Sequence, residues 1–96
     1  MLQVLIDAIK SRQVISFTYS GFARVAQPAT VGLSRTGKES LRCYQTQGGH
    51  VTQGHEWDFC DVSKMSNLKT TGATFANDPP GYKRGDAHMM RIFAEL

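Results

Sequence analysis

The sequence lacks the features of membrane and secreted proteins. No apolar run approaches the roughly 18 residues of a membrane-spanning helix, and the start, MLQVLIDAIK, carries Asp7 without a basic leader and cleavage site. We therefore expect a cytoplasmic protein with no membrane association. Cysteine is scarce: Cys43 and Cys60 are too few for a disulfide framework, so we expect buried free thiols.

Metal-binding and catalytic patterns are also missing. His50 and His55 lie in a glycine-rich stretch, and there is no CxxC or HExxH motif, so no metal or other cofactor is expected. There is no GxSxG motif, phosphate-binding glycine loop or Cys/His pairing. Asp58 and Asp61 are three apart on an expected strand and point to opposite faces, which suits shared acid–base work poorly. The sequence therefore predicts a protein that is not an enzyme.

Charge of one sign is not in large excess. The chain of 96 residues has 11 Lys plus Arg and 8 Asp plus Glu, a net charge of +3. Its composition is that of a single soluble domain spanning residues 1–96. Such a mild charge indicates a partner only if the basic residues converge on one face.

Hydrophobic periodicity predicts a helix, several short strands and a closing helix. Apolar residues recur at helical spacing in 1–12, and Asp86 is a plausible N-cap for a second helix that carries Met89, Ile92, Phe93 and Leu96. Alternating β-branched and aromatic residues predict strands at 13–19, 22–27, 40–46 and 56–68. Pro28 should stop the second strand, although residues 29–33 can continue in an extended conformation. Residues 70–86 are predicted to form a long turn-rich segment between strand and helix.

This order of elements is typical of a mainly β fold with flanking helices. Short, closely spaced strands form a strongly bent antiparallel sheet or a partly open barrel, here with an N-terminal and a C-terminal helix. Nothing helical separates the strands, which disfavours a parallel sheet.

Three cations on the expected strands are candidate ligand contacts. Arg24, Arg42 and Lys64 lie in separate strands or at their ends, with Tyr19 and Tyr44 nearby. Arginine binds phosphate through paired donors, and aromatic rings stack on bases, so the set suits a phosphorylated ligand that contains a base. The alternative for each cation is a surface side chain over the barrel; for Arg24 it is an ion pair with Asp58 or Asp61.

The stretches LIDAIKSRQVISFTYSGFARVAQP, KESLRCYQT and WDFCDVSKMSNL resemble, in this order, the WYL domain family. The resemblance implies a small Sm-like or SH3-like antiparallel β-barrel of the kind found in bacterial transcription regulators and phage-defence systems. Arg24, Leu41 and Lys64 match pocket positions of the family. Ser40 stands in place of a large ring and Ser63 in place of an aspartate, which implies an altered or a lost ligand.

The resemblance implies a regulatory module that binds a nucleotide, oligonucleotide or single-stranded nucleic acid in a basic pocket and signals to a protein partner. The candidate ligand-binding residues are Arg24, Arg42, Lys64, Tyr44, Tyr19, Ser40 and Ser63. Two alternatives stay open. One is a protein-interaction or homo-oligomerisation module that uses the barrel edges and a helix with Met89 and Met90; the other is a protein that sequesters a nucleotide.

Overall fold

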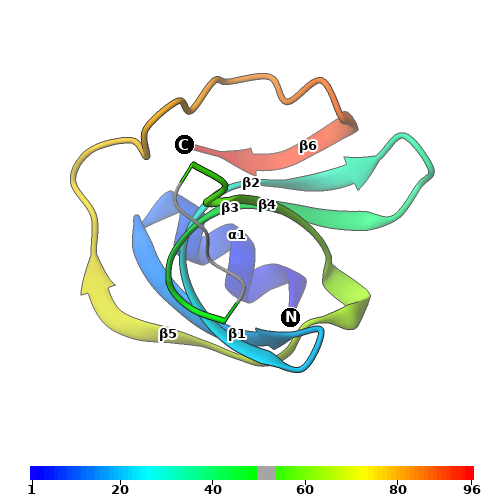
Figure 1. Ribbon diagram of the computed structural model, residues 1–96. Coiled ribbons are helices and arrows are strands. Elements are labelled where there is room, and N and C mark those ends of the chain that lie inside the picture. Colours follow the sequence, from blue (N-terminus) through cyan, green and yellow to red (C-terminus); the bar gives the residue numbers. More distant parts are fainter. Residues whose placement is uncertain (50–53) are drawn as a thin grey trace.

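The computed structural model describes residues 1–49 and 54–96 (Figure 1). In this part of the chain the helix α1 (Leu2–Lys10) is followed by strands and one 3₁₀ turn: β1 (Gln13–Tyr19), β2 (Phe22–Ser34), β3 (Glu39–Gly48), β4 (Trp57–Asp61), η1 (Val62–Lys64), β5 (Ser66–Thr74) and β6 (Met89–Glu95). All pairings are antiparallel, in the order β4-β3-β2-β1-β5, and β6 also pairs with β2. Within the described residues β4 and β5 do not pair, so the curved sheet is open.

The long strand β2 organises the sheet because two different strands share one of its edges. β1 pairs with residues 22–26 of β2, and β6 pairs with residues 30–34 of the same strand. Pro28 lies between these two partners, next to a register shift against β3. A proline, which has no N–H to donate, fits such a place. The prediction that Pro28 ends the strand is therefore wrong, and β2 continues to Ser34.

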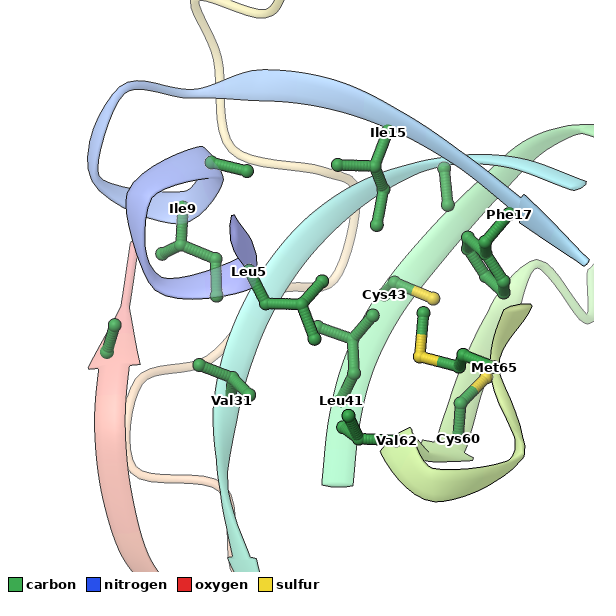
Figure 2. Close-up of a cluster of buried hydrophobic side chains, with 13 residues drawn as sticks. Leu5, Ile9, Ile15, Phe17, Val31, Leu41, Cys43, Cys60, Val62 and Met65 are labelled. Carbon is green, nitrogen blue, oxygen red and sulfur yellow. The ribbon is translucent and has the colours of Figure 1, made fainter. Parts of the chain in front are cut away.

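The core fills the concave side of the sheet, where α1 packs (Figure 2). Leu5, Ala8 and Ile9 of the helix are buried there. The two cysteines, Cys43 and Cys60, are buried free thiols as expected. A hydrogen bond with Cys60, together with burial, raises the pKa of the Cys43 thiol. Among the described residues no helix is long and apolar enough to cross a membrane.

The predicted C-terminal helix is wrong, since residues 89–95 form the strand β6. The C-terminal half of β2 extends beyond its pairing with β1, and β6 supplies the backbone hydrogen-bond partners there. Met89 is buried and Met90 is exposed, as strand alternation requires, so no helical methionine face exists. Asp86, rather than capping a helix, accepts a hydrogen bond from the His88 N–H at 2.9 Å in a turn before the strand.

The strand predicted over 56–68 is also wrong as a single element. The turn η1 divides it into β4 and β5, and the Asp61 carboxylate caps this turn by accepting the Ser63 N–H at 3.0 Å. Lys64 therefore lies in a turn. Residues 70–74, the start of the predicted turn-rich segment 70–86, belong to β5. The expectation that Asp58 and Asp61 point to opposite faces is confirmed: Asp58 pairs with buried Arg24, whereas Asp61 lines an outer pocket.

Candidate functional site

The candidate site lies on the outer side of β3 and β4, which is polar. Leu41 and Cys43 of β3 point into the core, so the alternate residues of β3 face outward. Three cross-strand pairs result on this outer face: Ser40 with Asp61, Arg42 with Phe59, and Tyr44 with Trp57. The β2–β3 turn borders this face at one end, and the segment of residues 79–88, here called the connector, packs over it.

A pocket of about 400 Å³ opens at the end of this face beside the β2–β3 turn, and we call it the turn pocket. Its wall combines cations, small hydroxyl residues and two aromatic rings. It is lined by Tyr19, Ser34, Arg35, Thr36, Lys38, Ser40, Phe59, Asp61, Lys64 and His88. The β2–β3 turn, η1 and His88, which directly precedes β6, thus bring basic or titratable side chains to one place.

The turn pocket has three cations, Arg35, Lys38 and Lys64, against the single carboxylate of Asp61. Lys38 Nζ lies 3.9 Å from Asp61 Oδ2. Hydrogen bonds from Ser63, followed by the nearby charges of Lys38 and Lys64, hold the pKa of Asp61 below its usual value. Asp61 is therefore ionised at neutral pH and offsets one of the three positive charges.

Tyr19 and Ser40 position the charged groups of the turn pocket. The Tyr19 hydroxyl accepts the Asp61 N–H at 3.0 Å and so links the end of β1 to the end of β4. Ser40 is buried, and its hydroxyl donates to the Lys38 carbonyl at 3.0 Å. Phe59 is different, because this residue of the pocket wall is 37% exposed.

Arg42 lies beside the turn pocket and is already paired. Its guanidinium donates to Asp86 at 2.8 and 3.4 Å, lies 3.1 Å from His88 Nδ1, and stacks over the Phe59 ring at 4.4 Å from the centroid. Burial alone would raise the pKa of Asp86, but the hydrogen bonds from Arg42 and the His88 backbone outweigh it and lower the pKa. This pair ties the connector to β3.

Arg24 points into the concave side of the sheet instead of toward the turn pocket. It is 7% exposed and donates to the Tyr19 carbonyl at 3.2 Å and to Gln45 Oε1 at 3.4 Å. Its Nη1 also lies 3.5 Å from Asp58 Oδ2. Of the two roles considered for Arg24, the ion pair with Asp58 is therefore present in the structure.

The predicted site residues divide into three groups. Tyr19, Ser40 and Lys64 meet in the turn pocket, and Ser63 adjoins it through its hydrogen bonds to Asp61. Arg42 lies on the far side of Phe59, and Tyr44 packs edge-on against Trp57 at 5.3 Å. Arg24 lies on the inner side of the sheet and meets the first group only at Tyr19, whose ring centroid is 5.4 Å from its guanidinium carbon. Their roles as ligand contacts stay predictions.

Sequence reasoning missed Arg35 and Lys38. Both lie in residues 35–38, which connect β2 to β3. The signal that could have found them is two cations in one short hairpin turn. Arg35 Nε donates to the Ala87 carbonyl at 2.8 Å, which leaves its terminal nitrogens without a hydrogen bond to any described residue.

A second pocket, of about 420 Å³, lies between the connector and the outer face of β3 and β4; we call it the connector pocket. It is lined by Thr30, Arg42, Trp57 and residues 81–88, and so shares His88 with the turn pocket. Trp57 Nε1 donates to the Pro80 carbonyl at 2.8 Å, which fixes the indole against the connector.

In the described ranges, no three His, Cys, Asp or Glu side chains are grouped so that they could hold a metal ion. His50, one of the histidines considered above, lies outside the described residues. Comparison with protein-family models, with curated proteins and with solved structures finds no match to this chain.

Proposed function

We propose that this protein is a non-catalytic module that binds the phosphate groups of a nucleotide, oligonucleotide or single-stranded nucleic acid in the turn pocket. The observation that carries the proposal is the grouping of Arg35, Lys38 and Lys64 around one pocket, opposed by a single carboxylate. A net positive pocket of this size attracts a polyanion, and its field acts over about 8 Å at physiological salt.

The chemistry of the individual groups supports phosphate. The free end of Arg35 offers a planar pair of donors, which matches two phosphate oxygens. Lys38 and Lys64 are exposed and supply point charges without the cost of desolvating a buried ion. Phe59 adds an aromatic surface at the same wall, on which a base can stack.

Arg24 has no part in this proposal, because its two terminal nitrogens bind Gln45, Tyr19 and Asp58 on the inner side of the sheet. As in the WYL family that the sequence resembles, the proposed consequence of binding is regulation of a protein partner. The strand order, with β2 shared between both halves of a curved sheet, supports a partly open Sm-like or SH3-like barrel as the finer description of the fold.

The experiment is a fluorescence-anisotropy titration of labelled oligo(dT) and oligo(rU) with the wild type and with the double variant Lys38→Gln/Lys64→Gln. Loss of two phosphate contacts should weaken binding by at least tenfold. Lys10→Gln is the matched control, since Lys10 is an exposed lysine of α1 outside both pockets. Equal affinity of the double variant and the control would reject the turn pocket as the site.

A further inference from the structure

The connector pocket is less positive than the turn pocket, because both of its arginines form ion pairs with carboxylates of the protein. Arg42 is paired with Asp86 at 2.8 Å. Arg84 is paired with Glu95 at 3.0 Å and also donates to the Leu96 carbonyl. Lys83 has no ion-pair partner among the described residues. With Lys83 left over, the pocket keeps one net positive charge, against two in the turn pocket, so it attracts a phosphate less strongly.

The aromatic rings of this pocket give it a flat, rigid wall. Trp57 is fixed by its hydrogen bond to Pro80 and by the edge-on contact of Tyr44 at 5.3 Å. Tyr82, which also lines the pocket, is held by the bond from its hydroxyl to the Leu96 carbonyl at 3.0 Å. Rings held in this way lose little entropy when a second ring stacks on them.

The inner end of the pocket carries an unpaired polar group. Thr30 is 1% exposed, and its hydroxyl forms no hydrogen bond with any described residue. Burial raises the pKa of Tyr82, and a contact with the Thr30 hydroxyl partly opposes that shift. A buried hydroxyl without a partner is costly, so a ligand that pairs with it gains that energy on binding.

From these features we propose that the connector pocket binds an uncharged heteroaromatic ring of the nucleobase class, with a ring nitrogen or exocyclic group that pairs with Thr30. The ring would lie between the connector and β3–β4, against Trp57 and Tyr82. Because the pocket shares His88 with the turn pocket, a ring here and a phosphate there could belong to one ligand. The proposal does not depend on that, since the two pockets are lined by otherwise separate residues.

The test uses free nucleosides, which carry no phosphate and therefore do not require the turn pocket. Adenosine, guanosine, cytidine and uridine are titrated into the full chain, and binding is followed by NMR. Trp57 is the only tryptophan, so the single indole N–H signal reports this pocket directly. We expect a saturable shift of that signal with at least one nucleoside.

The variant Thr30→Val removes the hydroxyl and keeps the shape, and should weaken the affinity roughly five- to tenfold. Thr30→Ser, which keeps the hydroxyl, should retain most of the affinity, and Lys10→Gln should match the wild type. If Thr30→Val does not fold, Tyr82→Leu on the connector should show the weakening instead. No shift of the Trp57 signal with any nucleoside, or an affinity unchanged in the variants, would overturn the proposal. Neither result would bear on the proposal that the turn pocket binds phosphate, because free nucleosides carry no phosphate.

Discussion

The guanidinium of Arg24 and the carboxylate of Asp58 lie 3.5 Å apart on the concave side of the sheet, joining β2 to β4 across β3. Asp58 lies opposite the buried Cys43 on the neighbouring strand. Arginine at this position is therefore part of the interior, where an ion pair contributes more than it does at the surface.

The first prediction follows from this pair. Arg24→Ala should lower the free energy of unfolding by about 2–4 kcal/mol, because it removes the ion pair with Asp58 and the buried hydrogen bonds to Tyr19 and Gln45. Urea unfolding followed by circular dichroism measures this loss. Arg35→Ala, an exposed arginine of the turn, serves as the comparison and should cost much less. A stable Arg24→Ala protein that has lost ligand binding would instead make Arg24 a ligand contact.

The second prediction concerns Asp86 and acid. Its pKa is lower in the folded chain than in the unfolded one, where it is near 4. Its stabilising contribution is therefore complete above that unfolded value and is lost as the pH falls through the folded pKa. Between pH 5 and pH 2 we expect Asp86→Asn to lose less stability than the wild type in urea unfolding. Parallel pH curves for the two proteins would show that the Arg42–Asp86 pair does not hold the connector.

The third prediction tests β6. Gly32 of β2 faces the Arg91 backbone of β6 so closely that a Cβ has no room. Gly32→Ala should therefore push β6 away from β2, and hydrogen exchange should show lost protection of amides in 89–95 while β1 to β3 stay protected. Gly21→Ala is a useful comparison, because Gly21 has open space around it and only its positive φ opposes a side chain. Equal protection of β6 in the wild type and Gly32→Ala would contradict the close β2–β6 packing.

The fourth prediction concerns Phe59. Replacing this exposed ring by leucine should reduce the affinity for a single-stranded oligonucleotide by about 1 kcal/mol, since base stacking is lost. Binding of inorganic pyrophosphate, which has no base, should be unaffected. Isothermal titration with both probes separates the two effects; an equal loss for both would mean that Phe59 acts only through the Arg42 guanidinium stacked on it.

The parts of the fold that follow from local sequence were predictable, and those that depend on distant partners were not. Alternation in 13–19 and helical spacing in 1–12 correspond to β1 and α1. The residues of β6 carry spacing compatible with a helix, and only the free edge of β2, far away in sequence, decides for a strand.

The same distinction applies to the candidate site. Cations could be identified along the chain, but alternation alone does not tell the inner from the outer face of a strongly curved sheet. The sequence therefore did not show that Arg24 lies on the inner face, whereas Lys64 is exposed. Arg35 and Lys38 join Lys64 because the β3–β4 pairing sets Asp61 opposite Ser40, which places η1 next to the β2–β3 turn. No spacing in the sequence encodes that approach.

The most direct test of phosphate binding in the turn pocket is its dependence on salt. Affinity for oligo(dT) is measured in the wild type and in Lys38→Gln/Lys64→Gln over a series of KCl concentrations. We predict that log K falls linearly with log [KCl], and that the double variant has a slope shallower by roughly 1.4, about 0.7 for each lost phosphate contact. A slope near zero in the wild type, or the same slope in both proteins, would contradict the assignment.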